Sequence, residues 1–177
     1  LGDLTAKLLQ KCDQICGYEI DEELFEILQN KFQTEILSKK LELNLGDILE
    51  NWGENLRDER YFLVANLPYY VATKIILKAI DDEKCVGMIV MIQKEVAMKF
   101  SANCGEKEFS ALAIMANLRG GCKICFDVAP DAFSPPPKVV SSVIKIEKLH
   151  EIYGENALFA TKTDYENFKN LRTRGFR

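Results

Sequence analysis

The amino-acid sequence predicts an α/β fold in which a mostly parallel sheet carries helices on both of its faces. Two observations support this class. Segments with helical and strand-like patterns alternate from the first residues, and two of the strand-like segments, 61–65 and 86–92, are apolar without interruption. Such continuous runs are typical of strands that are buried on both faces. We therefore expect a sheet of the doubly wound kind.

The elements of the first third follow from local periodicity. Residues 3–11 place Leu4, Leu8 and Leu9 at helical spacing, and 21–39 form an amphipathic pattern with acidic residues in the first turn. The predicted elements, in chain order, are a helix at 3–11, a strand at 14–20, a helix at 21–39 and an alternating strand at 41–45.

The later elements begin after a polar stretch. The predicted elements there are a strand at 61–65, a helix at 72–80, a strand at 86–92, helices at 93–102 and 110–118, and strands at 124–128 and 140–146 joined by a proline-rich turn. From residue 151 the sequence becomes basic and mostly helical in pattern. We therefore predict one domain at 1–148 and the start of a second, helical one at 149–177.

The sequence opens at a predicted helix, with Leu1, Gly2 and Asp3, and no strand pattern precedes it. In a doubly wound sheet the strand before the first helix is normally central, so its absence would leave a hole in the core. We therefore expect an N-terminal extension that supplies the first strand.

Composition excludes several classes of protein. Among 177 residues no apolar run approaches the roughly 20 that span a bilayer, so we expect a cytoplasmic protein with no membrane partner. The single histidine, His150, rules out mechanisms that need patterned histidines. Six scattered cysteines indicate reduced, packed thiols, and we expect no metal site. The net charge of −4 hides a basic C-terminal segment that suits phosphate contacts.

Three segments suggest a nucleotide site. Gly2 precedes the first helix, where a backbone without Cβ lets a nucleotide approach closely. Glu19 ends a strand, where an acid can accept hydrogen bonds from both ribose hydroxyls, whereas Asp21 fits better as a helix N-cap. Asp47 ends the next strand and can accept from an adenine amino group while Ile48 packs on the ring. A dehydrogenase would show the same features.

The deciding motif is Asn66-Leu67-Pro68-Tyr69, at the carboxyl end of a buried strand, where open α/β sheets bind ligands. The amino group of adenine is a poor nucleophile because its lone pair is delocalised into the ring. The side-chain oxygen of Asn66 and the carbonyl of Leu67 can grip its two N–H groups and localise that lone pair. Pro68 holds the carbonyl still, and Tyr69 offers a face for a flipped-out base. The alternative is a structural turn with Tyr69 in the core.

A second aromatic residue, Phe133, precedes the three prolines 135–137, which form a stiff, extended connector. This connector can hold Phe133 against the other face of the base. The alternative is a rigid turn in which Phe133 is the core anchor.

Together these segments resemble the KsgA family of ribosomal RNA adenine dimethyltransferases over about residues 1–148. The resemblance rests on 2–5, 18–21, 46–47, 66–70, 93–97, 110–112 and 133–141. It implies a Rossmann-like class I methyltransferase sheet, here without its first strand, followed by an incomplete helical domain that helps to bind RNA. One departure is Val140, where the family usually has an aspartate.

The resemblance also implies the function. Such enzymes use S-adenosylmethionine to dimethylate two adjacent adenosines near the 3′ end of small-subunit ribosomal RNA, and we expect a monomer that acts on the assembling small subunit. One alternative is a large-subunit rRNA adenine methyltransferase of the macrolide-resistance type. Another is a ribosome-assembly or RNA-binding factor with little catalysis.

Overall fold

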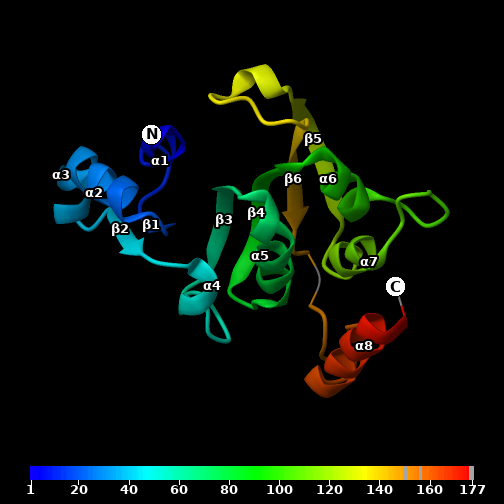
Figure 1. Cartoon of the computed structure of the whole chain (residues 1–177). Coiled ribbons are helices and arrows are strands. Elements are labelled where there is room, and N and C mark those ends of the chain that lie inside the picture. The colour runs from blue at the N-terminus through cyan, green and yellow to red at the C-terminus, as the bar shows by residue number, and fades with distance from the viewer. Residues whose placement is uncertain (150, 156, 176–177) are drawn as a thin grey trace. The chain divides into compact units, whose positions relative to one another are not determined.

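The structure is a computed structural model that describes residues 1–149, 151–155 and 157–175, so His150 lies outside the described residues. It divides into two compact units, Leu1–Leu56 and Arg57–Arg177, each with its own sheet. In Figure 1 the first unit is drawn in blue to cyan and the second in the remaining colours.

The first unit is built around two parallel strands. Its elements are α1 (Asp3–Leu8), β1 (Ile15–Glu19), α2 (Glu22–Lys31), α3 (Gln33–Leu37), β2 (Leu41–Leu45) and α4 (Ile48–Asn51). The strands pair in register from Ile15 opposite Leu41 to Glu19 opposite Leu45, so their carboxyl ends meet at one edge. A small core joins the helices to this pair, and its members are Leu9, Leu28, Phe32 and Leu41.

The prediction of one helix over 21–39 is wrong, because the segment forms two helices. Phe32 leaves the helical region of backbone space, with φ −112° and ψ 26°, between α2 and α3. Its side chain is only 5% exposed, so the apolar stripe continues through the break even though the helix does not. The four-residue helix α4 was not predicted, because it is too short to show a periodic pattern.

The second unit holds a four-stranded mixed sheet in the order β3-β4-β6-β5. Strands β3 and β4 are parallel, and β6 is antiparallel to both β4 and β5. Its elements are β3 (Tyr61–Asn66), α5 (Tyr69–Asp81), β4 (Cys85–Gln93), α6 (Lys94–Ser101), α7 (Ala111–Asn117), β5 (Cys122–Val128), the 3-10 turn η1 (Pro130–Ala132), β6 (Ser141–Glu147) and α8 (Lys162–Gly175).

Helix α5 fits its position because its apolar residues form one stripe. The buried members recur at the helical spacing, and they are Ala72, Ile75, Ile76, Ala79 and Ile80. The helix was predicted from residue 72 but begins at Tyr69, because Pro68 supplies the carbonyl that accepts from the N–H groups of Val71 and Ala72. Tyr69 therefore stands at the first helical position.

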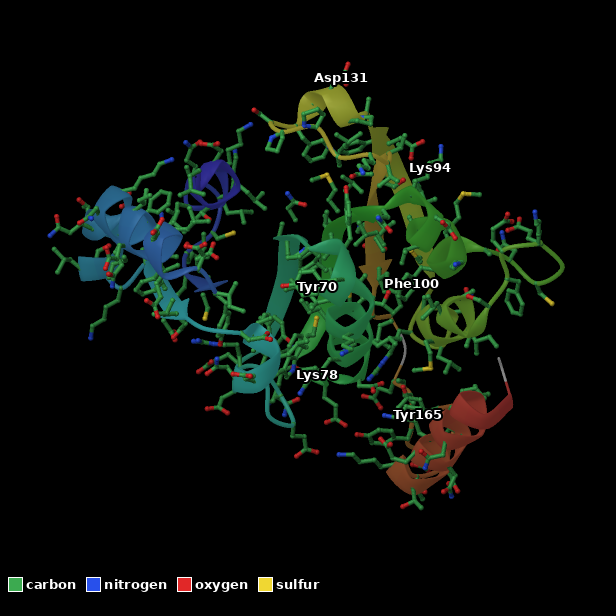
Figure 2. All side chains as sticks on the ribbon, in the orientation of Figure 1. Tyr70, Lys78, Lys94, Phe100, Asp131 and Tyr165 are labelled. Atoms are coloured by element: carbon green, nitrogen blue, oxygen red, sulfur yellow. The ribbon has the colours of Figure 1, made fainter. Side chains whose placement is uncertain are left out.

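The four-stranded sheet gathers several chain segments at one edge. Ser141, the first residue of β6, lies opposite Gln93 at the end of β4 and Val128 at the end of β5. Asn66 ends the parallel strand β3 at the same edge, opposite Met91. Figure 2 shows Lys94 and Asp131 toward this end of the sheet and Tyr165 toward the other. This is the edge at which the sequence motif places the site.

Helix α8 packs against the opposite end of the second unit. The Tyr165 side chain is 2% exposed, and its hydroxyl donates a hydrogen bond to a carboxylate oxygen of Asp81, the last residue of α5. Lys169 reaches the other oxygen of Asp81 at 2.8 Å. Within the described part of the chain, no helix combines the length and apolarity needed to cross a membrane.

Candidate active site

The Asn-Leu-Pro-Tyr motif forms the link between β3 and α5. Asn66 is the last residue of β3 and its side chain is exposed at the edge of the sheet. Leu67 prolongs the strand pairing by one residue, since its N–H donates to the carbonyl of Met91 at 3.1 Å. The Leu67 side chain is 6% exposed and anchors the turn in the core. The motif is therefore held by the sheet on one side and by the helix on the other.

The carbonyl of Leu67 stands outside the helical ladder. The ladder of α5 begins one residue later, at the carbonyl of Pro68, which accepts from the N–H groups of Val71 and Ala72. Pro68 has φ −58° and ψ 132°, and its ring fixes φ and restricts the residue before it to extended conformations. Pro68 therefore restricts the conformation of Leu67 and, with it, the range of directions open to the Leu67 peptide oxygen.

A cavity of about 300 Å³ lies over this turn. That volume is at the small end of the roughly 300–1,000 Å³ typical of ligand sites. Phe133 comes to it from the loop between η1 and β6, more than sixty positions along the chain from the motif. The residues that line it are Asn66, Leu67, Pro68, Tyr69, Phe133, Pro135 and Pro137. All five residues predicted for the target base therefore share one cavity.

The rings of Tyr69 and Phe133 are both only partly buried. Both residues line the cavity, and neither is fully enclosed in the core. Aromatic faces of this kind stack on nucleobases at roughly 1–3 kcal/mol per base. The cavity is thus lined by two aromatic residues together with Asn66 and Leu67.

Sequence analysis missed the contact that fixes Tyr69. Its hydroxyl lies 2.8 Å from the Oγ atom of Ser141, and the Ser141 side chain is 1% exposed. The two residues are 72 positions apart in the chain. No local sequence pattern predicts this contact, because the contact depends on β6 running antiparallel beside β4.

A second polar contact secures the same edge. Lys94 and Asp127 form an ion pair with 2.6 Å between Nζ and Oδ2, and Ser142 donates to Oδ1 of Asp127 at 2.7 Å. The hydrogen bond from Lys94, followed by that from Ser142, holds the pKa of the Asp127 carboxyl below its usual range. Val140 stands where the resembling family has an aspartate, yet its carbonyl accepts from the Lys94 N–H at 3.0 Å. Asp127 supplies a carboxylate to the antiparallel pair of strands β5 and β6.

The predicted nucleotide residues lie in the first unit. Gly2 has φ 70°, a left-handed conformation, and a Cβ there would come within 2.8 Å of side-chain atoms of Leu28 and Phe32. The left-handed backbone conformation therefore favours glycine at this position, and the close side chains leave little room for a Cβ. Ile48 opens α4 and is partly buried.

Glu19 and Asp47 occupy the carboxyl edge of the parallel pair β1–β2. The Glu19 carbonyl accepts from the Gly46 N–H at 2.8 Å, which places the residue before Asp47 beside Glu19. One oxygen of Glu19 accepts from the N–H groups of Ile20 and Asp21, and one oxygen of Asp47 accepts from the Leu49 N–H. These contacts orient both carboxylates and engage one oxygen of each.

The prediction that Asp21 is an N-cap is confirmed, because its Oδ1 accepts from the Leu24 N–H at 3.0 Å. Glu19 lies on the strand itself. Two oriented acids at neighbouring strand ends fit a nucleoside, whose ribose hydroxyls and adenine amino group are hydrogen-bond donors. This pair of acceptors suits the nucleoside part of S-adenosylmethionine.

Comparison with known proteins identifies the fold. A crystal structure of a dimethyladenosine transferase from Plasmodium falciparum superposes with a TM-score of 0.77 at 26% identity, covering 99% of this chain and 59% of that one. A structure of the 23S rRNA methyltransferase ErmE gives 0.76 at 21% identity, covering 97% of this chain and 65% of that one, which shows likeness of fold alone. The fold is that of the Rossmann-like methyltransferases.

Sequence comparison identifies the family. The profile described as "Ribosomal RNA adenine dimethylase" matches residues 1–171, and the chain belongs to this family. Proteins named "Ribosomal RNA small subunit methyltransferase A" are similar to it. The one from Campylobacter curvus is 59% identical over 96% of this chain and 59% of its own length, and the one from Campylobacter concisus is 57% identical over 96% and 61%. The chain thus spans about three fifths of the curated relatives it matches.

Proposed function

We propose that this protein transfers methyl groups from S-adenosylmethionine to the N6 atoms of two adjacent adenosines near the 3′ end of small-subunit ribosomal RNA, during ribosome biogenesis in the cytoplasm. The observation that carries the proposal is the cavity shared by Asn66, Leu67, Tyr69 and Phe133. Membership of the adenine dimethylase family supports the reaction, and the names of the Campylobacter relatives support the small subunit as substrate.

The proposed mechanism is positional. The target adenosine leaves its stack and its base enters between Tyr69 and Phe133. The side-chain oxygen of Asn66 and the carbonyl oxygen of Leu67 accept hydrogen bonds from the amino group and favour a pyramidal nitrogen with a localised lone pair. S-adenosylmethionine, when bound, supplies an electrophilic methyl group on a sulfonium sulfur. Preorganised dipoles and alignment then lower the barrier.

The proton balance needs no histidine. After attack the methylated nitrogen carries a positive charge and becomes acidic, so it can release its proton to solvent. The monomethylated amine keeps a single N–H group, so one of the two oxygens, on Asn66 or Leu67, holds it for a second transfer. In this proposal Gly2, Glu19, Asp47 and Ile48 bind the nucleoside of the cofactor, Asn66 also contacts the cofactor, and no metal takes part.

The domain assignment is also proposed. Residues 1–148 form the methyltransferase domain, and residues 149–177 begin a helical domain that contacts RNA. The basic composition of the C-terminal segment supports this role, and the bonds of Tyr165 and Lys169 to Asp81 support a fixed placement of α8. We expect the protein to act as a monomer on the assembling small subunit.

Label transfer tests the proposed function. The protein, expressed from its complete gene, is incubated with radiolabelled S-adenosylmethionine and, separately, with undermethylated small subunits, undermethylated large subunits and duplex DNA. We expect label on adenosines near the 3′ end of the small-subunit RNA. Label on large-subunit RNA alone would favour the macrolide-resistance type of activity. Binding to small subunits without label in any RNA would favour an assembly factor.

A further inference from the structure

Two consecutive serines begin strand β6, and both are buried. Ser141 is 1% exposed and Ser142 is fully buried. Their hydroxyls have different partners, since Ser141 Oγ lies 2.8 Å from the Tyr69 hydroxyl and Ser142 Oγ donates to Asp127. Successive side chains of a strand point to opposite faces of the sheet. The pair therefore secures both faces of β6 where the proline-rich loop enters the strand.

The backbone of Ser141 is held by neighbours on both sides. It lies opposite Gln93 of β4 and Val128 of β5, and the preceding carbonyl, that of Val140, accepts from the Lys94 N–H. A hydroxyl mounted on a central strand is a rigid reference point for a neighbouring side chain.

Tyr69, which the Ser141 hydroxyl contacts, needs a fixed contact of this kind. Tyr69 sits at the first position of α5 and is only partly buried. Rotation about the Cα–Cβ bond moves the whole ring between staggered wells, so weak packing alone leaves the position of the ring poorly defined. The hydroxyl oxygen lies on the long axis of the ring, at the end farthest from the backbone, so a hydrogen bond there restrains the direction of that axis. Stacking uses only the ring face, so the hydroxyl is available for this restraint.

We propose that Ser141 is a positioning residue that fixes the position of the Tyr69 ring, so that a stacked adenine presents its amino group to the oxygens of Asn66 and Leu67. The inference rests on the proposed function and extends it to a residue outside the motif. A displaced ring still offers an apolar surface, but a base stacked on it presents its amino group away from the two acceptors. Small errors of alignment lower the rate of a positional mechanism steeply. Loss of the restraint therefore lowers turnover more than it weakens RNA binding.

A double-mutant cycle tests the proposal with Ser141→Ala, Tyr69→Phe and the combined variant, each assayed for methylation of undermethylated small subunits. We expect each single variant to lower kcat by about three- to tenfold, the factor that one ordinary hydrogen bond sustains. KM for the cofactor stays at the wild-type value. The combined variant is no slower than the slower single one, because both changes remove the same hydrogen bond.

Ser142→Ala is the matched control, since it removes an equally buried hydroxyl from the adjacent residue of the same strand. It keeps wild-type kcat, whatever its effect on Tm, because Ser142 binds Asp127 rather than Tyr69. An equal loss of kcat in Ser142→Ala would show that general weakening of β6 is the cause, and would overturn the proposal.

Two other results would also overturn it. Multiplicative losses in the combined variant would show that Ser141 does not act through the Tyr69 hydroxyl. Wild-type kcat in Tyr69→Phe would do so even if Ser141→Ala fails to fold, because that variant removes the other end of the same bond. With an active wild-type protein these results reject the role of Ser141 alone, whereas a wild-type protein that labels no RNA rejects the proposed function as well.

Discussion

Replacement of Asp81 measures how firmly helix α8 is tied to the sheet-containing unit. One carboxylate oxygen accepts a hydrogen bond from the hydroxyl of Tyr165, which is 2% exposed. The other oxygen lies 2.8 Å from the ammonium group of Lys169, and that ion pair is partly exposed, with 20% of the lysine and 34% of the aspartate side chain accessible. Asp81 is thus the shared acceptor for two residues of α8.

The expected cost of Asp81→Ala follows from these two contacts. A buried hydroxyl left without its acceptor costs about 1–3 kcal/mol, and a partly exposed ion pair contributes about 0.2–1 kcal/mol. The free energy of unfolding should therefore fall by about 1.2–4 kcal/mol. Asp81→Asn keeps an oxygen for Tyr165 and loses only the charge, so its cost should stay near that of the ion pair.

Urea unfolding, followed by circular dichroism at neutral pH, gives these free energies from the transition midpoints at constant m-value. Asp131→Ala is the control, because Asp131 is an exposed carboxylate on the other end of the unit and should change stability by less than about 0.5 kcal/mol. If Asp81→Ala unfolded at the wild-type midpoint, α8 would not be anchored through Asp81, and the argument from burial would be refuted.

Two further predictions concern stability. Burial lowers the pKa of Lys148 to about 8, so between pH 8 and its ordinary pKa near 10.5 only the unfolded chain binds this proton. In urea titrations, the stability of the wild-type protein relative to Lys148→Met should therefore rise with pH across that window. A constant difference in stability would contradict this prediction. Gly120 has φ 142°, and a Cβ there would lie 2.7 Å from the Glu147 carbonyl oxygen, whereas a Cβ at Gly105, with φ 94°, meets nothing within 4 Å. Gly120→Ala should thus lower Tm more than Gly105→Ala in thermal unfolding, and the reverse order would contradict the steric argument.

Hydrophobic pattern was enough to predict the strands of the second unit. The uninterrupted apolar runs at 61–65 and 86–92 became β3 and β4. Strand β4 is largely buried, as such runs indicate, whereas β3 is only partly buried and its Phe62 is 43% exposed. The break between α2 and α3 could not be predicted, because the hydrophobic pattern continues across it. The Phe32 side chain continues the apolar stripe, although its backbone leaves the helical conformation. Hydrophobic periodicity therefore predicts which face is buried, but not whether the helical hydrogen bonds are continuous.

The candidate site likewise contains residues that the sequence predicts and one residue that it does not. The turn from Asn66 to Tyr69 could be predicted because its four functional residues are consecutive in the sequence. Phe133 could be predicted because three prolines follow it closely in the same loop. The partner of Tyr69 could not, since Ser141 meets it only through the order and direction of strands far apart in the chain. Local chemistry is readable from sequence, whereas support from distant strands requires the fold.

The central claim is that the side-chain oxygen of Asn66 and the peptide oxygen of Leu67 activate the target amine. The most direct test is the turnover of Asn66→Ala on undermethylated small subunits, with dimethyladenosine quantified in the digested RNA and folding checked by Tm. Because Asn66 is exposed, the account predicts an unchanged Tm and a loss of at least about 100-fold in kcat, comparable to the removal of one preorganised hydrogen-bonding group. Wild-type turnover in a folded Asn66→Ala protein would contradict it.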